Sequence, residues 1–262
     1  MLAPRNPRVV RLGRLSRERK VRRAEGRFVI DGPTLLADAL AAGVEVEECF
    51  VEPGALDREP VASAVAAATA AGARVDEVRG GLGGHLDVAT PNGVAAVAVV
   101  PEVSATSTGP ALDLVLIGVA DPGNAGTLLR TAEAVGARSV VLTDGSVDPF
   151  SPKVVRASAG SVMRMAVSSG APAAVLARLG DEGVLRVGTR GSDGLPPEAV
   201  DLTGPVALVL GNEAHGLPAD VEAMVDAWTA LPMVGAVESL NVAVAGSVLA
   251  FEVARQRRSA VG

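Results

Sequence analysis

Asp121-Pro-Gly-Asn-Ala-Gly-Thr-Leu-Leu-Arg130 is the first of three polar clusters that interrupt long apolar runs in this chain. The other two are Leu210-Gly-Asn-Glu-Ala-His-Gly-Leu-Pro218 and Leu231-Pro-Met-Val-Gly-Ala-Val-Glu-Ser-Leu-Asn241. Each cluster lies where a strand should end and a helix begin, which is where open α/β sheets place their ligand-binding crevice. The leading hypothesis is therefore a small-molecule site in the C-terminal half of the chain.

Apolar strands and helices alternate around these clusters. We expect strands at 112–120, 139–143, 164–168, 185–189 and 206–210, and helices near 126–135, 172–179 and 218–225. This alternation predicts an α/β fold whose parallel sheet is covered by helices on both faces. A last helix is expected from Ser239 to about Arg258. Its apolar stripe, at helical spacing, would contain Leu240, Ala243, Val244, Ser247, Val248 and Phe251.

The N-terminal part predicts a smaller α/β domain. We expect strands at 27–31, 44–51 and 94–100 and helices at 8–23, 33–42 and 61–71, the first helix having a thin apolar stripe of Val9, Leu12, Leu15 and Val21. Residues 101–110 are rich in Pro, Gly, Ser and Thr, a composition typical of a linker. The predicted organisation is a domain at 1–100, a linker at 101–110 and a second domain at 111–262.

Composition excludes several classes of site. Aromatic residues make up 2% of the chain and Tyr is absent, which argues against recognition by rows of stacking rings. The single cysteine, Cys49, excludes an internal disulfide, and two distant histidines, His85 and His215, make a zinc centre improbable, so no metal is expected. No apolar run is long enough to span a bilayer, so we expect a cytoplasmic protein without a membrane partner.

Charge is unevenly distributed. The net charge is -6, yet ten Arg and Lys residues lie between Arg5 and Arg27, opposed only by Glu18 and Glu25. Such asymmetry favours a nucleic-acid partner, because the local field governs the attraction of phosphates. The expected RNA contacts are Arg8, Arg11, Arg19, Lys20, Arg22 and Arg23. The competing interpretation is a solvated or disordered basic arm, or simply an Arg-rich helix.

The clusters do not fit the common nucleotide-binding patterns. Neither the second cluster nor the run Gly80-Gly-Leu-Gly-Gly84 has the spacing of a phosphate loop, and the first cluster lacks the dinucleotide fingerprint. On local structure alone, a helix cap and a site role explain Asn124 equally well. Ser239 is a plausible helix cap, and His215 is a turn residue.

Taken together and in order, the three clusters resemble the motifs of the SpoU (TrmH-like) family of S-adenosylmethionine-dependent RNA 2′-O-ribose methyltransferases. The resemblance covers about residues 110 to 258. The N-terminal part, with Thr90-Pro-Asn-Gly93, looks like the substrate-binding domain that precedes many such enzymes and resembles small RNA-binding ribosomal proteins. A departure is Ala214, which replaces a Gly often found there.

The resemblance implies a deep trefoil knot in the second domain and a homodimer with each active site close to the interface. It also implies S-adenosylmethionine contacts, which it places at Thr189, Gly191, Leu210, Gly211, Asn212, Leu231, Met233 and Leu240. Catalysis would rest on Arg130, as a base or as a phosphate clamp, in many relatives beside the partner's cofactor. The remaining residues would shape the site by hydrogen bonding: Asn124, Glu213, Ser239 and Asn241.

Ribosomal RNA, and in particular 23S rRNA, is the expected substrate, because the N-terminal domain resembles those of rRNA-modifying relatives. Transfer RNA is an alternative substrate. The chain could instead methylate a base or a small molecule, or it could be an RNA-binding protein that has lost catalysis. Ten clustered cations favour RNA over a small molecule, and the presence of all the motif residues disfavours loss of activity.

Overall fold

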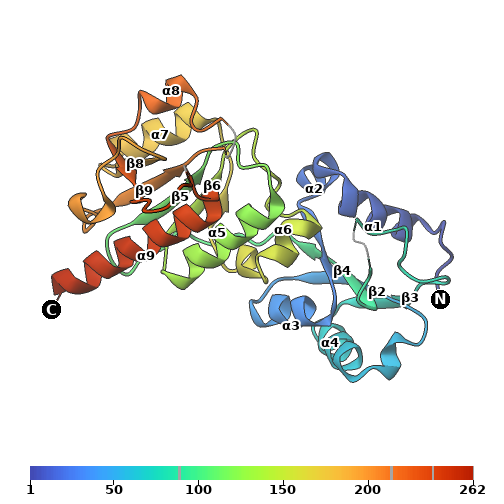
Figure 1. Cartoon of the computed structure of the whole chain (residues 1–262). Coiled ribbons are helices and arrows are strands. Elements are labelled where there is room, and N and C mark those ends of the chain that lie inside the picture. Colours follow the sequence, from blue (N-terminus) through green and yellow to red (C-terminus); the bar gives the residue numbers. More distant parts are fainter. Residues whose placement is uncertain (88–89, 213–214, 238, 262) are drawn as a thin grey trace. The chain divides into compact units, whose positions relative to one another are not determined.

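The computed structural model describes residues 1–87, 90–212, 215–237 and 239–261 (Figure 1). Its contacts divide the chain into two compact units. The first unit contains Met1–Glu102 and Asp148–Arg164, and the second contains Val103–Val147 and Met165–Gly262. The first unit thus includes a segment that the sequence places within the second domain, so each unit is described by itself.

The first unit is built on a four-stranded sheet. Its strands are β1 (Arg27–Asp31), β2 (Val46–Val51), β3 (Arg74–Glu77) and β4 (Val94–Val99), in the order β1-β4-β2-β3. Strand β4 pairs antiparallel with β1 and β2, whereas β2 and β3 are parallel. The helices are α1 (Pro7–Arg17), α2 (Arg19–Glu25), α3 (Pro33–Ala41), α4 (Glu59–Ala70) and α6 (Pro152–Ala157), with 3-10 turns η1 (Ala55–Asp57) and η2 (Ser161–Met163).

The basic N-terminal segment is folded, and it is two helices where the sequence predicts one. Glu18 interrupts the helical path with an extended backbone (φ -103°, ψ 106°), so that α1 ends and α2 begins around it. The predicted apolar stripe is buried and joins the core formed with Phe50 and Val97. A disordered arm is therefore excluded, because this segment supplies part of the hydrophobic core.

Residues 148–164 belong to the first unit through specific contacts. The Phe150 ring lies 5.2 Å, centroid to centroid, from that of Phe28 on β1. Asp148 accepts a hydrogen bond from Arg22 Nε at 2.6 Å, and the Arg22 side chain is only 5% exposed. A buried ion pair is costly to break from one side, so this segment is an integral part of the first unit.

The second unit contains a six-stranded parallel sheet in the order β10-β8-β9-β5-β6-β7. Its strands are β5 (Leu112–Leu116), β6 (Ser139–Leu142), β7 (Val167–Ser168), β8 (Leu185–Arg190), β9 (Val206–Leu210) and β10 (Ala227–Ala230). Its helices are α5 (Pro122–Ala134), α7 (Pro172–Asp181), α8 (Ala219–Glu222) and α9 (Val242–Val261), with a 3-10 turn η3 (Pro197–Ala199). All residues of β5 and β9 are buried, as central strands of a doubly covered sheet require. The predicted α/β class is confirmed.

Helix α9 packs tightly on α5 and β9. An ideal Cβ at Gly246 would lie 2.6 Å from side-chain carbons of both Leu128 and Leu210, so only glycine permits this approach. The hydroxyl groups of Thr131 and Ser247 are 2.7 Å apart and share a hydrogen bond. The buried face of α9 includes Ala243, Leu249, Ala250 and Val253.

Only part of the apolar stripe that the sequence predicts on α9 is buried in the chain, because Ala243 is buried and Ser247 contacts Thr131 while the larger apolar residues of the stripe are exposed. Val244, Val248 and Phe251 are 48%, 47% and 51% exposed, and Leu240 is 39% exposed. Spacings of three and four residues place the three helical side chains on one face. Helix α9 therefore has a second apolar face, which the chain itself leaves open to solvent.

Candidate active site

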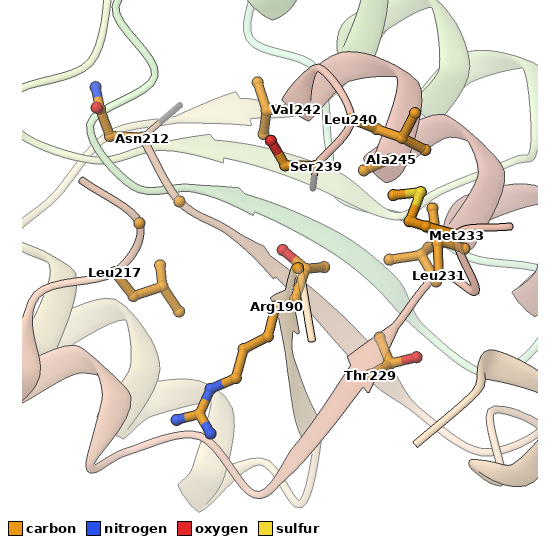
Figure 2. Close-up of a pocket in the computed structure, with 15 residues that line it drawn as sticks. Arg190, Asn212, Leu217, Thr229, Leu231, Met233, Ser239, Leu240, Val242 and Ala245 are labelled. Atoms are coloured by element: carbon orange, nitrogen blue, oxygen red, sulfur yellow. The ribbon is translucent and has the colours of Figure 1, made fainter. Parts of the chain in front are cut away.

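A pocket lies beyond the carboxyl ends of β8, β9 and β10 in the second unit (Figure 2). The residues that line it come from four segments: Thr189, Arg190 and Gly191; Gly211, Asn212, Gly216 and Leu217; Thr229, Leu231 and Met233; and Ser239, Leu240, Val242, Ala245 and Leu249. Segments far apart in sequence meet here because the carboxyl ends of parallel strands share one edge of a sheet. The second and third polar clusters are thus brought together in one cavity.

A tight loop after β9 forms one wall of this pocket. The amide of Asn212 donates to Gly216 O at 3.1 Å, and the amide of Gly216 donates to Asn212 O at 2.9 Å. An ideal Cβ at Gly211 would lie 2.6 Å from the Gly216 carbonyl carbon, so the two backbones touch. Asn212 Nδ2 also donates to Gly118 O at 2.9 Å, which fastens the loop near the end of β5.

His215 contacts its own loop. Its amide and its Nδ1 each lie 3.2 Å from Asn212 Oδ1, as expected for a turn residue. Glu213 and Ala214, which stand between these two residues in the second cluster, lie outside the described part of the chain. The predicted role of Glu213 therefore stays a prediction.

The pocket has apolar walls with a few polar groups, a composition typical of small-molecule sites. Leu217, Leu231, Met233, Leu240 and Leu249 supply the apolar surface. The polar groups are backbone amides and carbonyls beside Gly211 and side-chain hydroxyls, of which Thr229 Oγ1 already donates to Leu195 O at 2.9 Å. An adenosine moiety needs this combination: a slot for the base and fixed backbone groups for its polar edge.

The structure gathers seven of the eight residues expected to contact the cofactor: Thr189, Gly191, Gly211, Asn212, Leu231, Met233 and Leu240. The eighth, Leu210, is fully buried at the end of β9 and does not line the cavity. Its side chain packs instead beneath Gly246 of α9. Leu210 therefore supports the pocket from behind, and its expected contact with the cofactor stays a prediction.

The capping residues of α5 and α9 differ from those expected. Asp121, not Asn124, caps α5, because its Oδ1 accepts from the Asn124 amide at 2.8 Å. Asn241, not Ser239, caps α9, because its Oδ1 accepts from the amides of Ala243 and Val244 at 2.8 and 3.3 Å. Ser239 instead lines the pocket.

Asn241 also joins the first and third clusters. Its Nδ2 donates to Asn124 Oδ1 at 2.9 Å, so the start of α9 is linked to the first turn of α5. Arg130, farther along α5, is exposed and is not among the residues that line the pocket. Its guanidinium forms no hydrogen bond or ion pair with the residues that the structure describes. One chain thus assembles the pocket and leaves Arg130 available to another molecule.

Sequence reasoning missed several residues of the pocket. Arg190 lines it and stacks on Trp228 of β10, with its guanidinium carbon 3.6 Å from the ring centroid. Arg190 Nη2 also lies 3.8 Å from Glu222 of α8. A second cavity of about 830 Å³ adjoins the first and is lined by this arginine and tryptophan. Thr229 and Trp228 belong to β10, a strand that the sequence did not predict.

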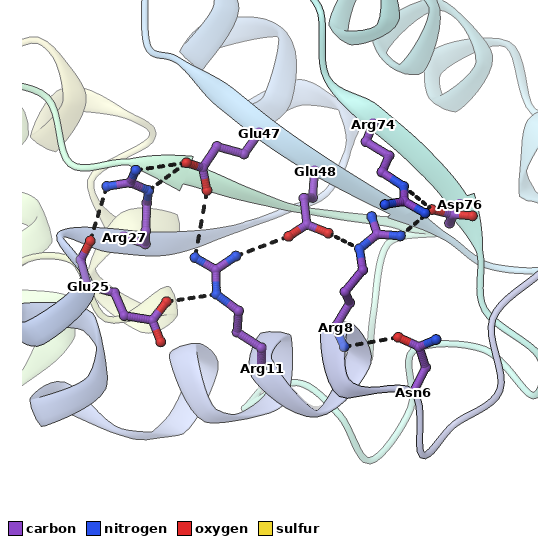
Figure 3. Close-up of polar contacts among 9 residues, drawn as sticks. All are labelled: Asn6, Arg8, Arg11, Glu25, Arg27, Glu47, Glu48, Arg74 and Asp76. Atoms are coloured by element: carbon purple, nitrogen blue, oxygen red, sulfur yellow. Dashed lines mark hydrogen bonds and ion pairs between the residues drawn. The ribbon is translucent and has the colours of Figure 1, made fainter.

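Three of the arginines expected to contact RNA are held within the first unit, and Figure 3 shows two of them, Arg8 and Arg11. Arg8 pairs with Glu48 and Asp76, and Arg11 Nε lies 2.7 Å from Glu25. Hydrogen bonds from Arg8 lower the pKa of Asp76, as those from Arg27 lower the pKa of Glu47, because they favour the charged carboxylates.

Arg22 is the third, since it is buried against Asp148 and donates to the carbonyl oxygens of Leu15 and Ser16 at 2.6 and 3.0 Å. Arg8, Arg11 and Arg22 therefore have structural partners within the first unit, and their contact with RNA stays a prediction. Lys20 and Arg23 are exposed and Arg19 partly so, and for these three RNA contact stays a prediction.

The described part of the chain offers no cluster of three or more His, Cys, Asp or Glu residues able to hold a metal ion. Cys49 is buried in β2, and burial raises the pKa of its thiol to about 12, so it is protonated at neutral pH and unsuited to nucleophilic chemistry. Within the same residues, no helix is both long and apolar enough to cross a membrane.

Comparisons with known proteins identify the family to which the chain belongs. Residues 111–251 match the model of the SpoU rRNA Methylase family, and residues 6–96 match that of the MRM3-like substrate binding domain. The Bacillus subtilis 23S rRNA (guanosine(2553)-2′-O)-methyltransferase RlmP is 36% identical over 162 residues, which are 62% of this chain and 64% of that protein. The chain thus spans a little less than two thirds of this relative.

Two solved structures are similar over nearly the whole chain. A crystal structure of an RNA 2′-O ribose methyltransferase has a TM-score of 0.80 and 34% identity, covering 98% of this chain and 99% of that one. The S-adenosylmethionine-bound rRNA methyltransferase from Sinorhizobium meliloti has a TM-score of 0.80 and 28% identity, covering 95% of each chain.

The second unit thus has a parallel sheet with a pocket at its carboxyl edge, and the N-terminal part of the chain matches a substrate-binding domain. The chain belongs to the SpoU rRNA methylase family.

Proposed function

We propose that this protein transfers a methyl group from S-adenosylmethionine to a ribose 2′-hydroxyl of 23S ribosomal RNA. The observation that carries the proposal is that seven residues expected to contact the cofactor line one pocket. The name of RlmP, a 23S rRNA guanosine 2′-O-methyltransferase, and the match to a substrate-binding domain support the choice of RNA. A ribosomal substrate in turn favours a cytoplasmic location.

The cofactor supplies an activated methyl group, so the chain must position the reactants and handle one proton. The methyl carbon leaves the sulfonium sulfur and bonds to the ribose oxygen, while the hydroxyl proton leaves to a base or to water. The apolar side chains of Leu231, Met233 and Leu240 would exclude water around the donor. Thr189, Gly191, Gly211 and Asn212 would contribute polar contacts.

We propose that Arg130 acts on the RNA. A guanidinium stays protonated in ordinary surroundings, so orienting a phosphate and polarising the hydroxyl is the role that its chemistry favours over that of a base. Its exposure, and its lack of an intramolecular partner among the described residues, leave it able to do so. Asn124, Glu213, Ser239 and Asn241 would shape the site by hydrogen bonding.

We propose further that the active form is a homodimer joined through the exposed apolar face of α9. Val244, Val248 and Phe251 form this face, and patches of this kind mark interaction surfaces. Arg130 lies on α5, the helix that packs on α9, so an interface there would bring it near the partner's pocket. We also propose that the second unit has the trefoil knot that the family resemblance implies.

The role of Arg130 is tested by Arg130→Ala. The protein is incubated with radiolabelled cofactor and total RNA from a strain that lacks the enzyme, and the labelled ribose is mapped. We expect transfer to fall by about 10²–10⁴-fold, with the calorimetric affinity for S-adenosylmethionine nearly intact. Unchanged turnover would remove Arg130 from the mechanism, and no label in RNA with the wild-type protein would refute the proposed function.

The dimer is tested by Phe251→Asp, which places a charge in the apolar face of α9. We expect sedimentation equilibrium to show monomers for this variant and dimers for the wild type, because a buried unpaired carboxylate is costly. Ala174→Asp, at an exposed position of α7, is the matched control and should stay dimeric. Equal masses for wild type and Phe251→Asp would contradict this interface.

A further inference from the structure

A further cavity, distinct from those described in the second unit, lies in the first unit at the carboxyl end of β1. It has a volume of about 650 Å³, within the range typical of ligand pockets. Three elements meet around it: the end of β1 with the first turn of α3, the start of α4, and α6. Its charged and amide side chains are those of Asp31, Arg58, Asn92 and Arg156. None of them belongs to the S-adenosylmethionine pocket.

Asp31 organises the floor of this cavity. Its side chain is 4% exposed, and it forms an ion pair with the Arg156 guanidinium. Asn92 donates to it twice, from Nδ2 to Oδ2 at 3.1 Å and from the amide to Oδ1 at 3.3 Å. Both carboxylate oxygens are thus engaged, so Asp31 acts as a positioning residue that holds Arg156 and Asn92 at the cavity. The Arg156 side chain remains 44% exposed.

Arg58 supplies a second cation. It is exposed, and its side chain forms no hydrogen bond or ion pair with the described residues. Its guanidinium lies over Gly93, where φ is +88° and an ideal Cβ would overlap the guanidinium. Gly93 ends the motif Thr90-Pro-Asn-Gly93, so this turn permits Arg58 to approach while Asn92 faces the same cavity.

The remaining walls complement an anion attached to an apolar group. Helix α3 begins at Pro33 without a side-chain cap, because its N-cap is Gly32, so the positive end of its dipole meets the cavity. Pro60 and Val61, at the start of α4, add apolar surface. Two cations and one carboxylate leave a net charge of +1 among the ionisable groups that line the cavity.

We propose that this cavity binds one nucleotide of the RNA strand, with its phosphate between Arg58, Arg156 and the first turn of α3, and with its sugar or base against Pro60 and Val61. The inference rests on the proposed function, because it takes RNA as the substrate. It gives the first unit a phosphate site that does not depend on Arg8, Arg11 and Arg22, which are paired within the chain.

The test uses the full-length protein and unmodified 23S rRNA transcribed in vitro. Filter binding at several KCl concentrations gives the dissociation constant and its salt dependence. We expect Arg58→Ala to weaken binding about 5- to 20-fold and to reduce the salt slope by about 1, as the loss of one phosphate contact does. Arg156→Gln, which keeps a donor for Asp31, should weaken binding in the same direction.

Arg178→Ala is the matched control, since Arg178 is 52% exposed on α7 in the second unit and its loss changes net charge equally. It should leave RNA affinity within about twofold of wild type. Circular dichroism checks the fold, and Arg58 has no described side-chain partner whose loss would disturb it.

Two results would overturn the inference. One is an Arg58→Ala protein that binds RNA with wild-type affinity and salt slope. The other is Arg58-dependent binding of free guanosine monophosphate without any effect on RNA, which would assign the cavity to a small ligand. Methyl transfer is measured separately on the wild type, so failed transfer with Arg58-dependent RNA binding refutes the proposed function and leaves this inference standing.

Discussion

Asn241 offers the sharpest test of how the pocket is built, because its single amide does two separable things. Its Oδ1 caps α9 by accepting from the amides of Ala243 and Val244, and its Nδ2 donates to Asn124 Oδ1 on α5. Asn241→Ala removes both functions. Asn124→Ala removes the contact between the two side chains and leaves the cap in place.

The expected magnitudes follow from these contacts. Loss of an Asn cap costs about 1 kcal/mol, and loss of one exposed side-chain hydrogen bond costs about 0.5–1 kcal/mol. We therefore expect Asn241→Ala to lower the free energy of unfolding by about 1.5–2 kcal/mol and Asn124→Ala by about 0.5–1 kcal/mol. Because the two variants lose the same bond, the double variant should cost about 0.5–1 kcal/mol less than their sum.

Trp228, the only tryptophan, lies in β10 and reports specifically on the second unit. Urea unfolding followed by its fluorescence measures the four free energies of the cycle. A loss for Asn241→Ala no larger than about 0.5–1 kcal/mol, the value of one hydrogen bond, would refute the cap, and strict additivity would refute the bond. Leu240 and Val242 flank Asn241 and line the pocket, so a frayed α9 should also weaken S-adenosylmethionine binding in calorimetry.

Two further outcomes are expected. Gly211→Ala should weaken S-adenosylmethionine binding and destabilise the second unit by about 1–3 kcal/mol, because its Cβ would overlap the Gly216 backbone; an unchanged dissociation constant would contradict this. Asp76 and Glu47 have lowered pKa values, so the stability that they contribute is present above their ordinary pKa near 4 and is lost as pH falls through the lower folded values. Thermal melts from pH 6 to 3 should show this loss, with a shallower dependence in Arg8→Met, whereas equal slopes would argue against the ion pairs.

The second unit was the more predictable part of the fold because its strands are continuous apolar runs. Val206–Leu210 is a strand with the predicted bounds, and β5 and β6 begin at the predicted residues. Strand β10, Ala227–Ala230, escaped prediction because its four residues include Trp and Thr and form no apolar run. It is defined by parallel pairing with β8, a long-range contact that no local pattern encodes.

The helix caps show a similar limit on what the sequence predicts. Asp121 and Asn124 both stand near the start of α5, and either side chain can accept a hydrogen bond from a free helical amide. The choice depends on the exact first residue of the helix, which is Pro122. Asp121, which caps α5, and Asn124, which contacts Asn241, are close neighbours in the sequence. Helix boundaries are the least certain feature that a sequence pattern provides, so the pattern does not decide which of the two is the cap.

The assignment of residues 148–164 to the first unit could not be inferred from composition. Residues 148–164 follow an apolar strand and precede another, so locally they resemble any connection in a parallel sheet. They join the first unit because Phe150 meets Phe28 and Asp148 meets Arg22, residues more than a hundred positions earlier in the chain. This placement also brings a cation from the second half of the sequence, Arg156, to Asp31 on β1.

The basic N-terminal run shows that a cluster of cations predicts a nucleic-acid partner only once the acidic residues that pair with it in the fold are known. Arg8 pairs with Glu48 and Asp76, which are 40 and 68 residues away, so this arginine looks unopposed in the sequence and is paired in the fold. A guanidinium already held by two carboxylates gains little from a phosphate, because the existing pairs must first be broken. Arg58, which lies between Asp57 and Glu59 in the sequence but has no described side-chain partner, carries no such cost. The effective phosphate ligands of the first unit are therefore expected where charge remains unpaired after folding.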